Sequence, residues 1–206
     1  MEIVIASRNL GKIREIRTML EDIESLDVDS LLAFPDFPSP DETGETFEDN
    51  ATLKATLAAS SLNKIVLADD SGLVVPALGG APGVKSARYA GEEATDRENN
   101  QKLLEALKEK DDLDRHAYYE CVLVLASPEG VLKVARGHCE GEITTEERGR
   151  NGFGYDPIFL KLDYDKTFGE LSDDVKNRVS HRRKALDAMR AYIEGLVAKS
   201  TADNSV

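Results

Sequence analysis

The sequence has only two cysteines and no long hydrophobic run. Its longest uninterrupted apolar stretch, Cys121–Ala126, is far shorter than the roughly 20 residues that a membrane-spanning helix needs. The beginning of the chain does not resemble a signal peptide, because charge follows at once at Arg8 and Lys12. We therefore expect no membrane segment and a location in the cytoplasm. Cys121 and Cys139 could approach each other on neighbouring strands, but we expect reduced thiols.

Basic residues are scarce: 26 Lys and Arg stand against 39 Asp and Glu, which gives a net charge of −13. This balance argues against a large nucleic-acid surface, because such surfaces depend on basic residues that meet phosphate. A local basic pocket for one small polyanion stays possible. Because no repeat or low-complexity linker divides the chain, we predict a single domain over residues 1–198 and a frayed polar tail over 199–206.

Strand-like and helix-like segments alternate in the first half of the chain, and a hairpin follows. Thr46 with Asp49, and Thr95 with Glu98, have the spacing of helix capping boxes. The patterns predict strands over residues 2–7, 64–68, 117–127 and 131–140, and helices that begin near residues 11, 46, 95 and 172. The predicted fold class is α/β, with a mixed sheet flanked by helices.

A short turn joins the first predicted strand to the first helix. It consists of Ser7, Arg8, Asn9, Leu10, Gly11 and Lys12. Free backbone N–H groups at a helix start, together with a lysine, suit a phosphate group. The alternative interpretation is an ordinary turn capped by Asn9.

Acidic residues appear at two places that suit a hard cation. Asp69 and Asp70 directly follow an apolar strand, and neighbouring side chains on an extended segment point to opposite sides, so one of the two is expected to face a site. Magnesium prefers oxygen ligands, and Glu42 offers a second carboxylate. Lys54, within a predicted helix, could reach back toward phosphate. The alternatives are a solvated turn for Asp69 and Asp70, favourable electrostatics at a helix start for Glu42, and a solvated helix face for Lys54.

A glycine-rich loop contains Phe153, Gly154, Tyr155 and Asp156. Its aromatic rings could stack on a nucleobase, and Asp156 could accept hydrogen bonds from a purine edge. In the alternative interpretation, the loop is a tight turn whose aromatic rings fill the core.

The last candidate is a set of cationic and donor groups, Lys176, His181 and Arg182. They share one side only if the helix breaks near Ser180, because positions five and six residues apart do not face the same way on a continuous helix. The alternative is a solvated basic face, since Arg183 and Lys184 continue the run.

Taken in order along the chain, these motifs resemble the inosine triphosphate pyrophosphatase family, also called the Ham1 or non-standard purine NTP pyrophosphatase family. The matching segments are Ser7–Lys12, Glu42–Phe47, Asn50–Lys54, Ala68–Gly72, Gly79–Gly83, Ser86–Tyr89, Gly152–Pro157 and Ser180–Arg182. The family pattern often has glycine at the position of Arg8.

This resemblance implies hydrolysis of ITP, dITP and XTP to the monophosphate and pyrophosphate, which clears deaminated purines from the nucleotide pool. It also implies a homodimer, with the substrate in a cleft between two lobes of an elongated mixed sheet. From the charge and the short apolar runs, we expect no nucleic-acid or membrane partner. Glu42 and Asp70 would bind Mg²⁺, and Asp70 would help to activate the attacking water. Phosphate contacts would come from Ser7–Lys12 and Lys54, and Ser71 would also contact the substrate. The base would lie against Phe153–Asp156, aided by Lys176, His181 and Arg182.

Two other functions compete with this hydrolase. A non-catalytic nucleotide-binding module would keep Lys12 and Phe153 but would not need the paired acids, so Asp70 distinguishes it. A nucleic-acid-binding protein would use the basic run from His181 to Lys184, although the net charge argues against it.

Overall fold

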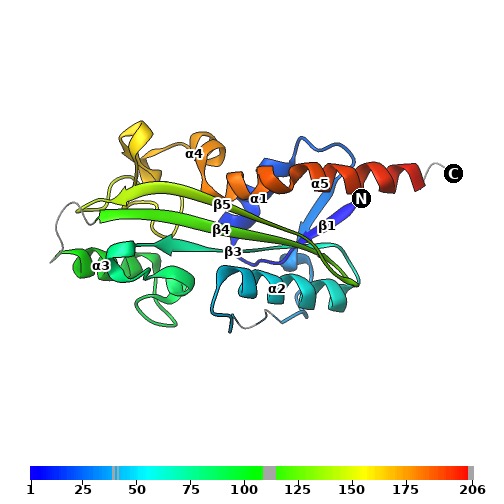
Figure 1. The fold of residues 1–206 in the computed structure, drawn as a ribbon, viewed down its shortest axis with the longest axis horizontal. Coiled ribbons are helices and arrows are strands. Elements are labelled where there is room, and N and C mark those ends of the chain that lie inside the picture. Colours follow the sequence, from blue (N-terminus) through cyan, green and yellow to red (C-terminus); the bar gives the residue numbers. More distant parts are fainter. Residues whose placement is uncertain (39, 41, 109–114, 204–206) are drawn as a thin grey trace. The chain divides into compact units, whose positions relative to one another are not determined.

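The computed structural model describes residues 1–38, 40, 42–108 and 115–203. Within them, seven strands form one mixed sheet in the order β2-β1-β3-β4-β5-β6-β7, with helices on its faces (Figure 1). The strands are β1 (Glu2–Ile5), β2 (Asp27–Ser30), β3 (Val66–Val74), β4 (His116–Ser127), β5 (Gly130–Ile143), β6 (Phe159–Lys161) and β7 (Lys166–Thr167). The helices are α1 (Leu10–Leu20), α2 (Phe47–Leu62), α3 (Asp96–Leu107), α4 (Asp173–Val179) and α5 (His181–Asp203). The predicted α/β class is confirmed.

The central strand β3 is longer than the sequence indicated. It pairs in parallel with β1 through Val4 with Val66 and Ile5 with Leu67, and then continues to Val74 as a neighbour of β4. The prediction that this strand ends before Asp69 and Asp70 is therefore wrong. Both acids lie within β3, beyond the stretch that pairs with β1, so backbone pairing on that edge no longer covers them.

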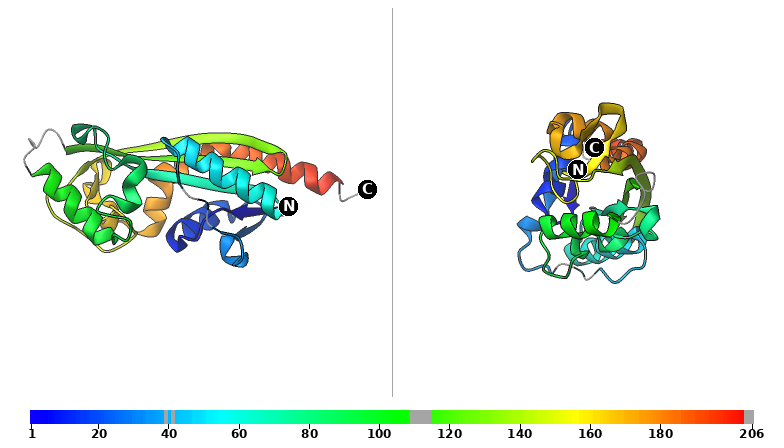
Figure 2. Two further views of the ribbon diagram at one scale, coloured as in Figure 1. Left: turned by 90° about the horizontal axis from the view of Figure 1, so that it is seen from below. Right: turned by 90° about the vertical axis from the view of Figure 1, so that its left-hand side faces the viewer.

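The chain divides into two compact units, and the boundary between them crosses β3, β4 and β5. The first unit contains residues 1–70, 121–137 and 182–206. In it, α2 covers one face of the strands, while α1 and α5 cover the other (Figures 1 and 2). Ile3, Ile16, Leu67 and Met189 join this core, and burial of each such side chain contributes about 1.5–3 kcal/mol.

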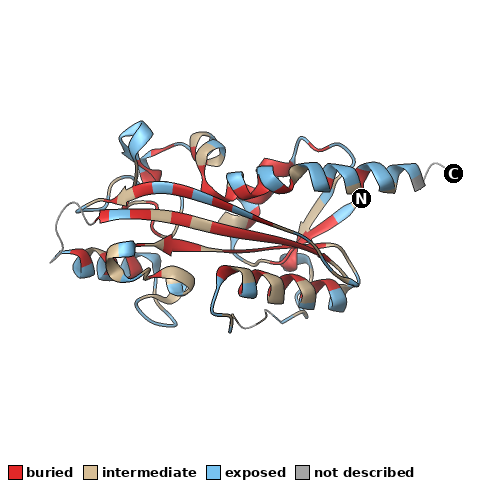
Figure 3. Cartoon of the chain, in the orientation of Figure 1, coloured by how far each residue is buried: buried red, intermediate tan, exposed pale blue. Residues whose placement is uncertain are grey.

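The second unit contains residues 71–120 and 138–181. Helices α3 and α4 belong to it, and Leu103, Tyr119, Phe159 and Phe168 are buried in its core. Figure 3 shows that the helices of both units bury one side and expose the other, as amphipathic helices do. The single catalytic domain and the substrate cleft stay predictions.

The capping motifs in the sequence correctly predicted where two helices begin. Both predicted capping boxes are present, with Thr46 and Thr95 each accepting a hydrogen bond from a backbone N–H three residues on. A helix break at Ser180, the condition for the cationic groups to share one side, is present, because this residue is extended between α4 and α5. The prediction of a frayed tail is wrong for residues 199–203, where α5 continues, and residues 204–206 lie outside the described part. No described helix combines the length and apolarity needed to cross a bilayer.

Candidate functional site

One ammonium group joins the two predicted metal ligands. Lys54 Nζ lies 3.0 Å from Glu42 Oε1 and 2.9 Å from Asp70 Oδ1. Lys54 comes from the buried side of α2, Asp70 from β3, and Glu42 from the segment before α2. The structure thus brings together three residues that the sequence singled out separately, and two carboxylates that are far apart in the sequence meet around a single cation.

Burial sets the electrostatics of this cluster. Asp70 is 4% exposed, and burial, with Glu42 adding to it, raises the pKa of its carboxyl although Lys54 pulls in the other direction. Burial by itself would lower the pKa of Lys54, but the nearby carboxylates of Asp70, Asp69 and Glu42 raise it. The ammonium therefore stays charged, while Asp70 binds a proton more readily than an exposed aspartate does.

Asp69 faces the opposite side of β3, as the alternation of an extended chain requires. Its Oδ2 lies 3.0 Å from Lys12 Nζ and 3.1 Å from Arg182 Nη2, and Arg182 also pairs with Glu15. Burial alone would raise the pKa of Asp69, but Lys12 and Arg182 hold it well below its usual range. Asp69 therefore stays ionised, and it holds the ammonium group of Lys12, a residue of the first turn of α1.

The predicted phosphate loop is a capped turn in this structure. Asn9 Oδ1 accepts the N–H of Lys12 at 3.0 Å, and Ser7 Oγ accepts the N–H of Asn9 at 3.1 Å. Arg8 donates to the carbonyls of Phe34 and Phe37, at 3.0 and 2.7 Å, and so fixes the segment after β2.

The other two residues of this turn are at least partly accessible to solvent. Leu10 is 70% exposed and Gly11 is half-buried at the first turn of α1. Their backbone N–H groups lie at a helix start, which favours anions. Phosphate binding by this turn stays a prediction.

In the second unit, the glycine-rich loop is fixed by its own acid. Asp156 is 2% exposed. Its Oδ2 accepts a hydrogen bond from the N–H of Phe153 at 2.8 Å and forms an ion pair with Lys176 Nζ at 2.5 Å. Lys176 Nζ also lies 4.6 Å from the centre of the Phe153 ring. The half-buried Phe153 ring is the part of the loop that is available for stacking, and Asp156 has a structural task that the sequence did not reveal.

Tyr155 belongs to the core. It is 3% exposed, its hydroxyl donates to the carbonyl of Ser86 at 2.8 Å, and burial raises the pKa of its phenol. The prediction that Tyr155 offers a stacking surface is wrong, and for this residue the alternative of a core-filling ring is correct. The neighbouring Gly154 has a φ of 62°, a backbone conformation that glycine adopts at little cost.

The cationic set around Ser180 has three different settings. Lys176 is paired with Asp156, the ring of His181 stacks on Tyr119 at 4.5 Å, and Arg182 is held by Asp69 and Glu15 in the first unit. These contacts fix each side chain separately, so convergence on the base stays a prediction.

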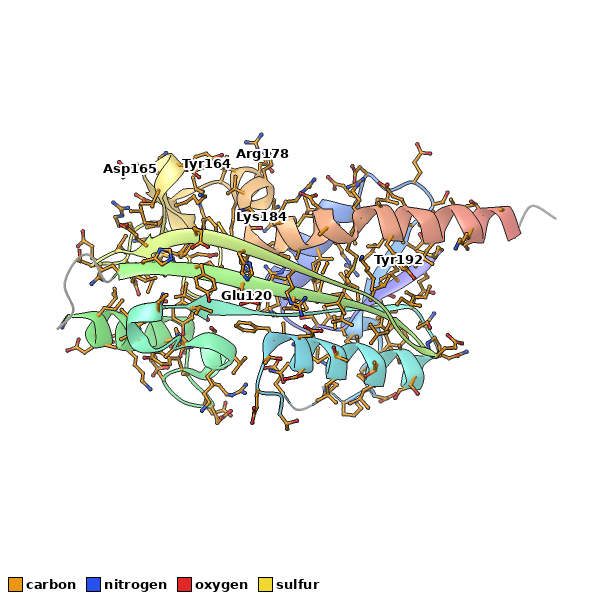
Figure 4. The ribbon with its side chains drawn as sticks, in the orientation of Figure 1. Glu120, Tyr164, Asp165, Arg178, Lys184 and Tyr192 are labelled. Atoms are coloured by element: carbon orange, nitrogen blue, oxygen red, sulfur yellow. The ribbon has the colours of Figure 1, made fainter. Side chains whose placement is uncertain are left out.

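Two further residues of this region complete the account of the predicted site. Lys184, which continues the basic run, is exposed on α5 (Figure 4), as the alternative interpretation expected. Ser71 follows Asp70 on β3 and is half-buried, and its contact with substrate stays a prediction.

Sequence reasoning missed Asn50, which is 1% exposed and donates to Asp70 Oδ2 at 3.2 Å. Its signal was present, because it precedes Lys54 by one helical turn and so shares its face. Glu15 was missed as well. It lies on the buried side of α1 and pairs with Arg182, and nothing near Glu15 in the sequence indicates this distant partner.

Glu42 and Asp70 have the donors that Mg²⁺ prefers. Magnesium is commonly held by one or two carboxylates, with waters and substrate phosphates as its remaining ligands. Among the described residues, no group of three or more His, Cys, Asp or Glu side chains is arranged around a metal position. The two carboxylates that pair with Lys54 are the number that such a site commonly has.

The model of the Ham1 family matches residues 3–192. The chain belongs to the Ham1 family. Among its relatives, the dITP/XTP pyrophosphatase of Protochlamydia amoebophila (strain UWE25) is 53% identical over 95% of this chain and 99% of its own length. The protein of the same name from Chlamydia caviae is 51% identical over 97% of each chain.

Solved structures of the Ham1 family share the fold. The Staphylococcus aureus Ham1 protein matches with a TM-score of 0.83 and 47% identity, covering 95% of this chain and 99% of its own. A HAM1 protein from Coxiella burnetii matches with a TM-score of 0.85 and 45% identity, covering 94% and 98%. The predicted resemblance is confirmed over nearly the whole chain.

Proposed function

We propose that this Ham1-family chain hydrolyses ITP, dITP and XTP to the nucleoside monophosphate and pyrophosphate, with Mg²⁺ as its cofactor. The pairing of Glu42 and Asp70 around Lys54 is the observation that carries the proposal. The names of the relatives from Protochlamydia and Chlamydia support the substrate class. We also propose that the protein acts as a homodimer, as the family resemblance implies, and that it does so in the cytoplasm.

The charged residues of the first unit suit attack on a triphosphate. Dense negative charge on the phosphates repels an attacking water, and the ammonium groups of Lys12 and Lys54 offset that charge. Asp70 accepts a proton from the water, and the raised pKa that burial gives its carboxyl makes it a better base than an exposed aspartate. Glu42 and Asp70 would hold the magnesium ion, which would supply further charge neutralisation and lower the pKa of a bound water.

The second unit supplies the groups that suit a purine. The Phe153 ring stacks on the base, which is worth about 1–3 kcal/mol. Lys176, which lies over the same ring, offers a donor for a 6-oxo group. A 6-amino purine presents a donor there instead, and a site built to donate penalises such a mismatch because its buried groups stay unpaired. ATP is therefore expected to be a poor substrate.

The Asp70→Asn variant tests this proposal. It keeps the shape and the hydrogen bond from Asn50 but removes the base, so turnover of ITP is expected to fall about 10²–10⁴-fold while ITP still binds. Asp29→Asn is the matched control, since the half-exposed Asp29 pairs only loosely with Arg17 at 3.4 Å. Unchanged turnover in Asp70→Asn, or full turnover of the wild type in excess chelator, would refute the proposal.

A further inference from the structure

Two side chains of helix α3 form hydrogen bonds with the backbone of the glycine-rich loop. Asp96 Oδ2 accepts the N–H of Gly154 at 2.7 Å, and Asn100 Nδ2 donates to the carbonyl of the same Gly154 at 3.2 Å. Residues four apart lie on one face of a helix, so both reach the loop together. All three residues belong to the second unit, so the contact lies within one compact body.

Gly154 directly follows Phe153, whose ring is half-buried. On its other side, the N–H of Phe153 is held by Asp156. The loop therefore has one anchor before the Phe153 ring and another after it. Gly152 and Gly154 both have positive φ, so this backbone has wide conformational freedom unless contacts restrict it.

Asn100 has little to contribute to stability alone. It is only 2% exposed, and within the part of the chain that the structure describes its Oδ1 has no hydrogen-bond partner. A buried polar atom without a partner costs about 1–3 kcal/mol, which offsets the gain from the single bond to Gly154. An apolar side chain of similar size would pack at this position at lower cost, so the amide is best explained by its hold on the loop.

We propose that Asp96 and Asn100 are positioning residues for base recognition: they fix the peptide at Gly154 and thereby the orientation of the Phe153 ring. Neither side chain needs to touch the nucleotide. This inference rests on the proposed function, because it assigns Phe153 to the purine. It predicts that loss of the hydrogen bonds from Asp96 and Asn100 to Gly154 weakens binding of the base and does not change binding of the phosphates.

The Asp96→Ala variant is the main test. Loss of a hydrogen bond to a charged acceptor at an exposed position is expected to raise KM for ITP about five- to tenfold, with kcat within about twofold. Inhibition by inosine monophosphate, which carries the base, should weaken by a similar factor, while inhibition by pyrophosphate, which has no base, should stay unchanged. Asp96→Asn keeps an acceptor oxygen and should restore most of the wild-type KM.

Glu98→Ala is the matched control on the same helix turn. Glu98 is also exposed and caps α3 through Thr95, but it makes no hydrogen bond to Gly154 in the described contacts. It should lower Tm by an amount similar to that in Asp96→Ala without a change in KM. Equal KM values for these two variants, or a loss of pyrophosphate inhibition in Asp96→Ala, would overturn the proposal.

A second variant distinguishes an effect on the orientation of the loop from an effect on the stability of α3. Asn100→Leu removes the donor and the unpartnered oxygen, so Tm should stay equal or rise while KM for ITP increases severalfold. A lower Tm with an unchanged KM would mark Asn100 as structural and overturn its role. If the wild-type protein does not hydrolyse ITP at all, the proposed function is wrong. If the wild type hydrolyses ITP but Asp96→Ala and Glu98→Ala have the same KM, only the positioning role of Asp96 is wrong.

Discussion

Replacement of Lys54 by methionine removes the ammonium group that pairs with both Glu42 and Asp70. Methionine keeps the length of the side chain but not the charge, so two carboxylates are left facing each other. The side chains of Lys54 and Asp70 are only 10% and 6% exposed, which leaves little water to screen the repulsion. The variant therefore tests whether this cluster is held together by charge.

The cost follows from the burial of the pair. Removal of one partner of a buried ion pair costs about 3–5 kcal/mol, and because Glu42 is 30% exposed we expect a value near the lower end, about 3 kcal/mol. For a chain of this length, such a loss lowers Tm by roughly 6–12 °C. Lys64→Met is the control: Lys64 pairs with Glu2 at 2.7 Å on an exposed surface, where an ion pair contributes about 0–1 kcal/mol.

Magnesium gives the assay its specificity. In thermal unfolding without nucleotide, Mg²⁺ should raise Tm more in Lys54→Met than in the wild type, because the ammonium no longer competes for the two carboxylates. At ten times its dissociation constant, a ligand that binds only the folded state contributes about 1.4 kcal/mol. An equal response to Mg²⁺ in both proteins, or a stability loss no larger than that of Lys64→Met, would refute the reasoning.

The other predictions concern residues that the structure places in the core or in tight turns. Gly152→Ala should lower stability by about 2–3 kcal/mol and raise KM for ITP, because φ is 76° and a Cβ would lie 1.9 Å from Asp156 Oδ2; an unchanged melting curve would contradict this. Tyr155→Phe should lose about 1 kcal/mol through its bond to Ser86 with KM for ITP unchanged, as denaturant unfolding and kinetics would show. Arg182→Met should destabilise the fold by about 3–5 kcal/mol, since it removes the guanidinium that pairs with the buried acids Asp69 and Glu15, and a wild-type Tm would count against it.

Features set by local chemistry were predictable from the sequence. The capping boxes at Thr46 and Thr95 and the break at Ser180 depend on residues within a few positions of one another. The alternation rule also predicted correctly that Asp69 and Asp70 face opposite sides, because it follows from strand geometry alone. These are the parts of the fold in which a side chain meets its own backbone.

Features set by distant partners were not predictable. The end of β3 was misplaced because β4, far along the chain, keeps that strand extended past Asp70. Tyr155 looked available for stacking because nothing nearby in the sequence shows that its hydroxyl meets Ser86. Arg182 was grouped with its sequence neighbours, although it is held by acids from α1 and β3.

Phosphorus NMR of ITP incubated with the protein and Mg²⁺ distinguishes release of pyrophosphate from stepwise loss of phosphate. We predict one pyrophosphate for each inosine monophosphate, with no inosine diphosphate or inorganic phosphate, and a reaction about 10²–10⁴-fold slower in Asp70→Asn. Inosine diphosphate with inorganic phosphate, or the same products at the same rate from Asp70→Asn, would contradict this prediction.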